Sequence, residues 1–424
     1  MPMSFRHWPD HRPAGAVGIA TITLLSLCWP RAAEAQNPTV PPGHPRVYVQ
    51  SADLPAIQAK LQNPAFAEAW QDVQDSSDPV ARAFVYLATG DANAGQSAVS
   101  GGLSALQACD DARVFNQAMH WGACVYDWCY DLLSSNQRQA FVTEFERIAG
   151  LHSPDFPADP EAPSVVGHVT EGWLLTGQLP AGVAIYDEAP TMYDAAATLF
   201  MSRFVEVRDY YYPAHMHHQG DSYFARFAHD QAASWLFRRM GAGDVLSRDQ
   251  QYVPYQILYA LRPDGQQLRS GDTYNDSGKS SSKRLIAMLT GSYYDDPYLL
   301  TLADSDLYWN PPDYHQVLEL LFRPAGAASA PLEQLPRTKL FAMPMGEMVA
   351  RTGWQLGVDS PDTVVQMRIG GTFFGNHQRK DFGTFQIYHR GPLAIASGVY
   401  EGDNCNYGCD HWLHYHHQTV SQNG

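Results

Sequence analysis

The chain has 424 residues, of which 45% are hydrophobic and 17% are charged, and its formal net charge at pH 7 is −16. A chain of this length exceeds one ordinary hydrophobic core, so we expect two domains. The acidic balance argues against nucleic acid and anionic membrane surfaces as partners, because both require a broad basic face.

Residues 1–35 have the features of an export signal. Arg6 and Arg12 give the segment a basic start, residues 14–29 are mostly apolar, and Ala-Glu-Ala at 33–35 is a small-x-small cleavage site. The apolar run is too short to cross a membrane. We therefore expect a secreted or periplasmic protein. Losing the segment changes the net charge from −16 to −17, because three basic and two acidic residues leave with it.

Five cysteines follow the export segment. In an oxidising compartment Cys405 and Cys409 could close a small loop, and Cys124 could pair with Cys109 or Cys129. The odd count leaves one thiol unpaired. No two-pair spacing typical of a cysteine zinc site is present in the sequence.

From residue 51 to about residue 321 the chain is predicted to be helical. Apolar residues recur at spacings of three and four, with Pro, Gly or polar residues between the runs. No repeat of fixed period is visible. An unrepeated series of amphipathic helix pairs over this length predicts an α/α array or toroid. The predicted helices cover 54–61, 64–73, 80–87, 111–132, 137–148, 164–175, 191–211, 223–240, 247–261, 283–289 and 297–302.

After a connector at 322–336, rich in Pro, Ala and Gly, the apolar period changes to two, which predicts short antiparallel strands. Four or five strands are too few for a sandwich with a covered core, so we expect a truncated β domain. The predicted strands are 345–352, 363–369, 383–388 and 392–395, and the predicted divisions are an export signal (1–35), a helical domain (36–325) and the start of a sheet domain (337–424).

The stretch 375–388 is the most densely functional part of the chain. Asn, His, Arg, Lys and Asp fall within six residues, directly before an alternating strand. Thr384, Gln386 and Tyr388 are predicted to face one way, and the residues between them the other way. A rigid strand can hold the polar side chains of an adjoining turn in fixed positions where a substrate contacts them. For any single residue, a basic surface turn is the simpler interpretation.

Two further polar clusters fall in the helical region. His168 and Glu171 are three residues apart and would share a helix face. The stretch 210–226 holds three histidines, which could suggest a metal site. Pro213 and Gly220 mark a loop there, so the histidine spacing cannot be assigned to one face. A sugar-binding cleft suits such an aromatic-rich loop equally well.

The order of these segments resembles the heparinase II/III-like polysaccharide lyases. The resemblance covers residues 44 to 424, and it implies an α+β multidomain fold: an α/α toroid, then an antiparallel β-sandwich domain with the active site in the cleft between them. It also implies that this chain lacks much of the β portion. The segments that carry the resemblance are 44–48, 53–55, 168–171, 184–188, 218–223, 351–354, 375–388 and 391–400.

The resemblance implies β-elimination at a uronic acid of an acidic polysaccharide, such as heparin, heparan sulfate or an alginate-like polyuronate. Tyr223 resembles the catalytic tyrosine of the family. Asn376 and His377 resemble the pair that faces the uronate carboxylate, and a protonated Glu171 could assist them. His168 resembles the histidine that acts as a base on the opposite face of the sugar.

Other residues are expected to bind the substrate. A phenol with a pKa near roughly 10 needs a cationic neighbour to act as a base, and Arg226 lies one helical turn after the tyrosine. Gln219 belongs to the same loop, Arg379 adds positive charge beside the motif histidine, and Tyr407 could line the cleft.

Many members of the family hold a structural zinc ion in the β domain. The three corresponding positions here are Arg379, Ala396 and Gln422, none of which offers the expected imidazole or carboxylate. We therefore expect no metal and no other cofactor.

Two alternative functions remain open from the sequence. One is an α/α-toroid glycoside hydrolase that uses paired carboxylates from among Glu171, Asp187, Glu188 and Asp272. The other is a non-catalytic protein that binds acidic polysaccharide, or an inactive fragment.

Overall fold

The computed structural model describes residues 37–110, 117–151, 172–273, 281–305, 313–374, 377–400, 410–421 and 423. The compact unit Asn37–Gly424 is described here by itself. The predicted export segment 1–35 lies outside the described residues. None of the helices in the described ranges combines the length and apolar character that a bilayer crossing requires.

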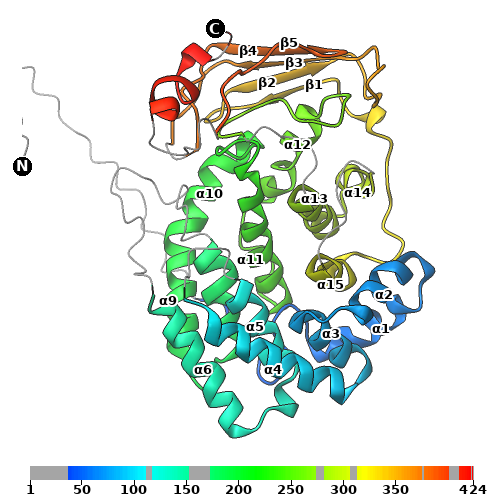
Figure 1. Ribbon diagram of the computed structural model, residues 1–424, viewed down its shortest axis with the longest axis vertical. Helices are drawn as coiled ribbons and strands as arrows, with labels where there is room; N and C mark the ends of the chain where they lie inside the picture. Colours follow the sequence, from blue (N-terminus) through cyan, green and yellow to red (C-terminus); the bar gives the residue numbers. More distant parts are fainter. Residues whose placement is uncertain are drawn as a thin grey trace, which may run out of the picture. The chain divides into compact units, whose positions relative to one another are not determined.

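Helices come first in the chain, and strands follow them (Figure 1). This order confirms the predicted succession of a helical region and an antiparallel sheet, whereas closure of the helices into a toroid stays a prediction. The helices are α1 Leu54–Leu61, α2 Ala67–Asp75, α3 Pro79–Thr89, α4 Ala92–Ala108, α5 Gln117–Trp128, α6 Ser135–Ala149, α8 Leu179–Ala184, α9 Pro190–Leu199, α10 Val205–Tyr211, α11 Phe227–Arg239, α12 Tyr255–Ala260, α13 Ser281–Tyr294, α14 Pro297–Ala303 and α15 Asp313–Phe322.

Helices α4, α8 and α15 were absent from the predicted set. Helix α4 contains three glycines and three serines, which are weaker helix formers than alanine, and few large apolar residues that would mark a helical face. Its small residues allow close packing instead: a Cβ on Gly95 would lie 2.3 Å from the Leu132 side chain, and one on Gly102 would lie 3.0 Å from Val125. Asp91 caps the helix by accepting bonds from the amides of Asn93 and Ala94. Tertiary packing therefore overrides the low helix propensity.

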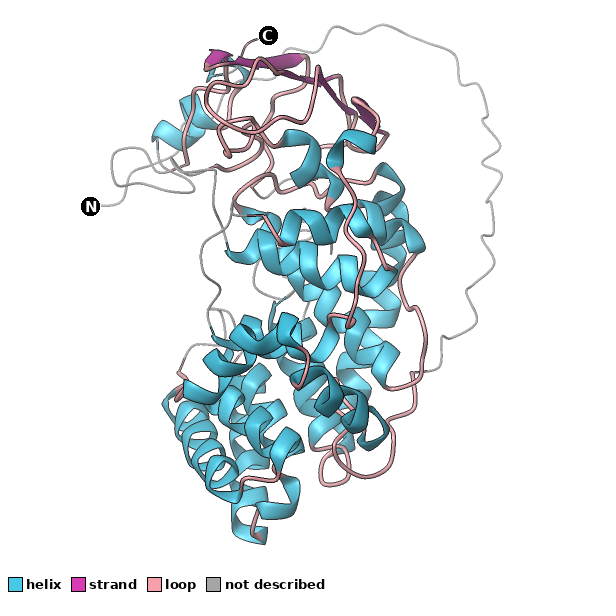
Figure 2. Ribbon diagram, turned by 90° about the vertical axis from the view of Figure 1, so that its right-hand side faces the viewer, coloured by secondary structure: helices cyan, strands magenta, loops and turns pink. Residues whose placement is uncertain are grey.

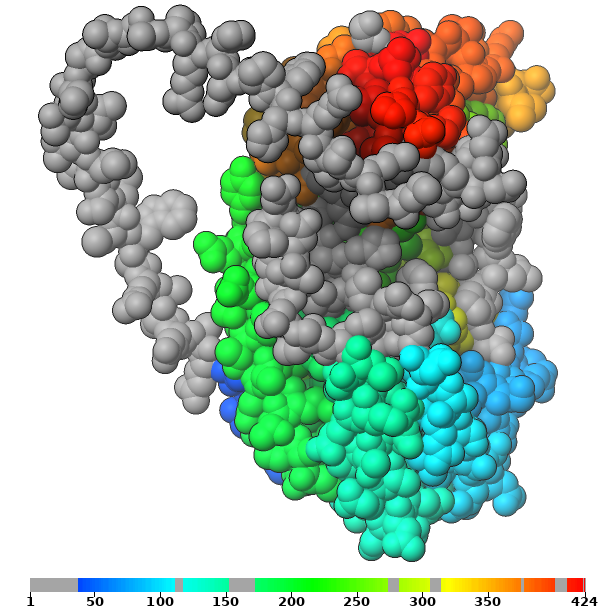
Figure 3. Space-filling view, turned by 60° about the vertical axis from the view of Figure 1, so that its left-hand side comes forward, coloured from blue at the N-terminus to red at the C-terminus, as the bar shows by residue number. Residues whose placement is uncertain are grey.

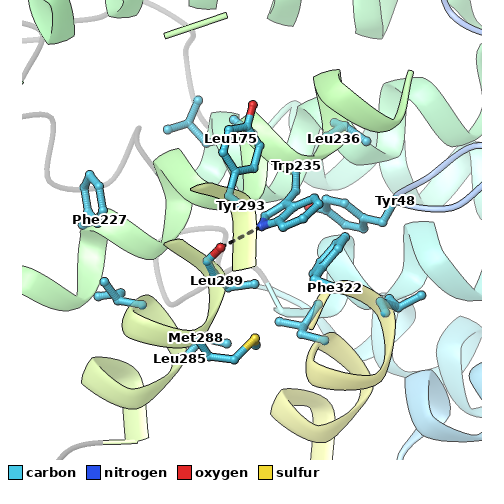
Figure 4. Packing of buried hydrophobic residues seen from close by; sticks show 14 of the residues in the cluster. Tyr48, Leu175, Phe227, Trp235, Leu236, Leu285, Met288, Leu289, Tyr293 and Phe322 are labelled. Atoms are coloured by element: carbon cyan, nitrogen blue, oxygen red, sulfur yellow. Dashed lines mark hydrogen bonds between the residues drawn. The ribbon is translucent and has the colours of Figure 1, made fainter. Parts of the chain in front are cut away.

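The helical core is built around large aromatic side chains from distant helices. Trp235 of α11 stacks on Phe322 of α15, with ring centroids 4.3 Å apart, and its indole N–H donates to the carbonyl of Leu289 at 3.2 Å (Figure 4). Tyr48 meets the same phenyl ring edge-on at 5.8 Å. These contacts tie the first described residues of the chain to α11, α13 and α15.

Among the described residues, the sheet has five strands in the order β1-β2-β3-β4-β5, and each neighbouring pair is antiparallel. Four strands were predicted, and β1 was not, because its four residues alternate too briefly to give a clear period. The sheet lies at one end of the helices in this unit (Figure 2). The strands are β1 Thr338–Phe341, β2 Glu347–Arg351, β3 Thr363–Arg368, β4 Thr384–His389 and β5 Pro392–Ala394.

Strand β4 alternates as predicted, and its polar face is the buried one. Gln386 is buried and exchanges two hydrogen bonds with the backbone of Arg269, at 2.6 and 3.2 Å. The opposite face of the sheet exposes apolar side chains, including Met367 and Phe385, which pair across β3 and β4. The inward face is therefore joined to the loop before α13 by hydrogen bonds rather than by hydrophobic contact alone.

The expected disulfide at Cys124 is wrong. Cys124 and Cys129 are both buried in or next to α5 as thiols, and Cys124 is bonded to neither of its two predicted partners. Burial raises the pKa of the Cys129 thiol to about 12, which suppresses the thiolate needed for exchange. Cys405 and Cys409 lie outside the described residues.

Candidate active site

Three segments far apart in the chain meet at one backbone junction. Gly220 and Gly271 form an isolated antiparallel bridge, and the amide of Asp221 donates to the carbonyl of Ser270 at 2.8 Å. The amide of Asp272 donates to the carbonyl of His377 at 2.7 Å. The loop before α11, the loop before α13 and the turn before β4 are therefore held together by main-chain bonds.

Glycine is required at this junction because the backbones approach too closely for a side chain. Gly220 has φ +82°, and a Cβ there would lie 2.1 Å from the carbonyl oxygen of Ser270. Gly271 has φ +57°, and its Cβ would meet the carbonyl oxygens of Gln219 at 2.4 Å and of His377 at 2.8 Å. Both positions combine a left-handed backbone with an unavoidable clash.

The junction places Tyr223 directly against His377. Their rings are stacked, with centroids 3.5 Å apart and planes inclined by 14°. Arg226 lies one turn after the tyrosine, with its guanidinium carbon 4.5 Å from the centre of the phenol ring and Nη2 3.4 Å from His377 Nε2. His377 itself adopts φ +39°, a conformation that non-glycine residues seldom occupy and that concentrates at functional sites.

Asp272 accepts hydrogen bonds from three side chains at the site. It is completely buried, and its Oδ2 accepts from His377 Nδ1 at 2.7 Å. Its Oδ1 accepts from His416 Nε2 at 2.7 Å and from the indole of Trp412 at 3.4 Å. Burial by itself would raise the pKa of Asp272, but the bonds from the two histidines outweigh burial and hold that pKa below its usual value. The carboxylate therefore carries a negative charge inside the protein.

Two arginines at the ends of this chain of bonds decide which ring nitrogens carry hydrogen. A guanidinium only donates, so the nitrogen that it meets must be an acceptor. Arg226 meets Nε2 of His377, and Arg379 meets Nδ1 of His416 at 3.1 Å. Each histidine is then left with one N–H, directed at Asp272. Burial lowers the pKa of both histidines, whereas the hydrogen bonds to Asp272 would raise it. Burial is the larger effect, so both pKa values lie below the ordinary value of histidine. Both rings are thus neutral donors.

Arg379 lies inside the protein rather than at the edge of a cleft. Its side chain is 1% exposed, and Nη2 also donates to the carbonyl of Gly398 at 2.8 Å. A guanidinium cannot ligate a metal, and the side chain of Ala396 has no ligand atom, so these residues do not fit the zinc site that the family resemblance implies. Within the described ranges, no set of three or more His, Cys, Asp or Glu side chains is arranged to hold a metal ion.

The C-terminal segment 410–421 closes the back of the site. It carries His416 and Trp412 and lies beside the strands (red in Figure 3). Tyr400, which precedes it, is buried with its ring centroid 5.8 Å from that of Tyr223 and 5.7 Å from that of His377. Asp221, which belongs to the backbone junction, forms a buried ion pair with Lys283 of α13 at 2.6 Å.

The loop histidines do not form a metal site. His217 and His218 are buried, and burial lowers the pKa of His217 to about 3. His215 points elsewhere, with Nε2 3.3 Å from Asp249 and Nδ1 3.1 Å from Lys339. Gln219 is fully buried, and its amide atoms have no hydrogen-bond partner among the described residues.

Of the predicted site residues, the structure brings Tyr223, Arg226 and His377 together and places Gln219 and Arg379 in the buried surroundings. The sequence analysis missed the bonds that join Asp272 to His377 and to His416. These contacts span 105 and 144 residues, and the only local signal was the Gly-Asp pair at 271–272 in a polar loop. The predicted site residues His168, Glu171, Asn376 and Tyr407 lie outside the described residues.

The carboxylates considered for a hydrolase lie elsewhere or are already bonded. Asp187 is 3.0 Å from Arg46, and Glu188 accepts from the Tyr130 hydroxyl at 3.2 Å. Both oxygens of Asp272 are bonded, and its side chain is inaccessible. The described residues therefore provide no exposed carboxylate pair at this site.

No protein-family model matches the chain, and no curated protein matches it. Among solved structures, it is similar to heparan sulfate lyase HepC from Pedobacter heparinus, with 13% identity and a TM-score of 0.48, over 86% of this chain and 52% of that chain. It is also similar to heparinase III, with 15% identity and a TM-score of 0.47, over 81% of this chain and 53% of that chain. The chain spans about half the length of these solved structures.

Proposed function

We propose that this chain carries the active site of a polysaccharide lyase that cleaves a uronic-acid-containing polysaccharide by β-elimination. The observation that carries the proposal is the stack of Tyr223 on His377, with Arg226 beside both rings. A phenol, an imidazole and a guanidinium from separate segments supply the acid–base group and the positive charge that elimination requires.

The reaction removes the C5 proton of a uronate. The electron pair of that C–H bond forms the C4–C5 double bond, the C4–O bond to the neighbouring sugar breaks, and the leaving oxygen takes up a proton. The C5 proton lies next to a carboxylate, whose negative charge opposes the charge that develops during abstraction. A lyase must therefore both neutralise this carboxylate and provide a base.

Tyr223 is assigned as the base that takes the C5 proton and then as the acid that protonates the leaving oxygen. The adjacent guanidinium of Arg226 favours the phenolate, because an opposite charge at short range stabilises the charged form. Tyr223 is only partly buried, whereas His377 beneath it is 1% exposed. His377, held by Asp272, thus positions the phenol and the guanidinium. It reaches the uronate carboxylate only if Tyr223 and Arg226, which lie against it, move.

The remaining roles rest on the sequence resemblance. Asn376 and a protonated Glu171 would contact the uronate carboxylate, His168 would act as a base from the opposite face, and Tyr407 would line the cleft. The same proposal includes a toroidal arrangement of the helices, export from the cytoplasm and activity without a metal.

Ultraviolet absorbance of the product tests the proposal. Only elimination leaves a conjugated unsaturated uronate, so hydrolysis of the same polymer would produce reducing ends without the new absorbance. The purified chain should be assayed with heparin, heparan sulfate, chondroitin, hyaluronan, alginate and ulvan. Absorbance with at least one of them supports the lyase. Reducing ends without absorbance would favour the hydrolase, and calorimetric binding without any cleavage would favour the non-catalytic alternative.

A further inference from the structure

We propose that a cavity beside the Tyr223 turn is a binding site for an uncharged pyranose unit. The proposal rests on the proposed lyase function in one respect: it assigns this unit to a sugar of the same polysaccharide. The cavity has a volume of about 290 Å³, at the lower end of the usual range for small-ligand sites.

The cavity adjoins the candidate active site through the chain itself. Ala225 lines it and lies between Tyr223 and Arg226 in the single 3₁₀ turn Tyr223–Arg226. Ala228 and Ala232 continue the same wall along α11. Leu285 and Leu289 of α13 also line the cavity, and they form part of the apolar packing seen in Figure 4. A sugar in the cavity would thus contact α11, the helix that begins directly after the turn that holds the phenol.

The wall has the composition of a carbohydrate site. Trp121 and Tyr314 both line it, with ring centroids 5.1 Å apart, and His120 stacks on the indole at 4.0 Å. Aromatic faces bind the apolar C–H surface of a pyranose, while imidazole nitrogens and an indole N–H can bond its hydroxyl groups.

Two buried polar atoms of this wall have no hydrogen-bond partner among the described residues. They are Nε1 of Trp121 and Nδ1 of His315. Buried polar atoms are normally bonded, and leaving one without a partner is costly. Both atoms have almost no accessible surface, so the hydroxyl groups of a ligand would bond them only after these side chains shift toward the cavity, whereas an apolar ligand would leave them unsatisfied.

The described residues that line the cavity carry no formal charge. None of its described lining residues is Asp, Glu, Lys or Arg. Burial is the largest cause that lowers the pKa of His120 and His315 to about 3 and that of His229 to about 4, so all three imidazoles are neutral at physiological pH. The guanidinium of Arg284 is already paired with Glu319 at 2.8 Å. A sulfate or carboxylate would enter this cavity without a counter-charge, which burial strongly disfavours.

Saturation-transfer NMR on the full chain tests the site with three probes: N-acetylglucosamine, its 6-sulfate and glucuronate. The neutral sugar should bind, and both charged sugars should bind about tenfold more weakly or not at all, which is a free-energy difference of about 1.4 kcal/mol. Equal binding of the sulfated sugar, or no binding of the neutral sugar, overturns the proposal.

Two variants locate the binding. Trp121→Ala removes an aromatic face, and Ala228→Leu fills the cavity without deleting any core side chain, so the second variant still tests the proposal if the first does not fold. Both should abolish the neutral-sugar signal. Ala105→Leu, at an exposed position of α4, is the matched control and should keep the signal. Retention of the signal in a folded Ala228→Leu protein overturns the proposal.

The two proposals fail in different ways. If the neutral sugar binds but no polymer yields unsaturated product, the lyase is wrong and the cavity site stands. If a polymer is cleaved, and Ala228→Leu leaves the KM unchanged, the lyase stands and the cavity has no part in substrate binding.

Discussion

Asp272 and His377 are joined by two bonds in opposite directions: the aspartate amide donates to the histidine carbonyl at 2.7 Å, and the histidine Nδ1 donates to the carboxylate at 2.7 Å. Backbone and side chain together fix the position and the tautomer of a ring that supports Tyr223. The two loops are 105 residues apart in the chain, so this pair holds the helical part and the sheet part at the site.

Tyr223→Phe should abolish turnover, because the variant retains the stacked ring but loses the hydroxyl that exchanges protons. Substrate binding, measured by calorimetry, should be largely retained. Tyr210→Phe is the matched control, since this tyrosine is 58% exposed, and it should turn over at the parental rate. Substantial ultraviolet product from Tyr223→Phe would falsify the assigned role.

Asp272→Asn should lower kcat by roughly 10²-fold or more, the scale of an acid–base contribution. Oδ1 already accepts from His416 and Trp412, so the new amide NH₂ must face His377 Nδ1 and displace its hydrogen to Nε2. An N–H at Nε2 would then face the guanidinium of Arg226, which can only donate, so two donors would meet.

Imidazole nitrogen NMR should report the changed tautomer of that single histidine in Asp272→Asn, which a general loss of packing would not produce. Asp362→Asn is the control: this aspartate is also buried but accepts from the amide of Gln355 in the sheet region. It should reduce stability without altering either the tautomer or kcat. An unchanged His377 tautomer in Asp272→Asn contradicts the positioning role.

Gly220→Ala should disrupt the junction. The added Cβ would lie 2.1 Å from the Ser270 carbonyl oxygen, so the loops must separate and turnover should be lost. Gly243→Ala provides the comparison, because Gly243 also has positive φ, +76°, but nothing lies within 4 Å of a Cβ there. That control should cost about 1–2 kcal/mol of unfolding free energy, the price of a left-handed alanine, and keep its activity. Equal losses in urea denaturation and in activity for both variants would show that the clash is unimportant.

Acid should destabilise the fold before it protonates Asp272. Burial lowers the pKa of His120, His217 and His315 to about 3, against about 6.5 in an unfolded chain. Below pH 6.5 the unfolded state takes up protons that the folded state does not. The free energy of unfolding should therefore fall with pH, by about 1.4 kcal/mol per pH unit for each such histidine, down to about pH 4.

Urea denaturation across this pH range measures the slope. His315→Gln should reduce the slope by about 1.4 kcal/mol per pH unit, the contribution of one histidine. His414→Gln, at an exposed position, should leave the slope unchanged. A flat profile between pH 6.5 and pH 4.5 would mean that these imidazoles are protonated in the folded state.

Chelator treatment should leave both turnover and the melting temperature unchanged. The guanidinium of Arg379 already bonds His416 and the carbonyl of Gly398, so the site is closed by a fixed cation rather than by an ion that a chelator can remove. Dialysis against a strong chelator, followed by assay with and without added zinc, is the measurement. Activity that disappears and returns with zinc contradicts the prediction.

Local periodicity was a good guide to single elements. Spacings of three and four predicted α1 at its observed bounds, and alternation predicted β4 within one residue at each end. It failed for α4, whose glycines are weak helix formers but allow contact with Val125. The disulfide at Cys124, expected from the oxidising compartment rather than from periodicity, was also wrong. Periodicity also did not reveal that the polar face of β4 is the buried one, because Gln386 finds its partner in a loop 117 residues away.

The amino-acid sequence by itself determined the helix-then-strand order, because that order depends on spacing along each segment. The resemblance of its motifs to a known family made Tyr223 and His377 candidates, and Arg226 followed from its place one turn after the tyrosine. Only the tertiary structure decided that Asp272 and His416 stand behind His377, that Arg379 is buried with them, and that an uncharged cavity adjoins the tyrosine turn. The physical reason is that such contacts join residues 37 to 144 positions apart, where glycine-permitted backbone approach, and not local pattern, selects the partners.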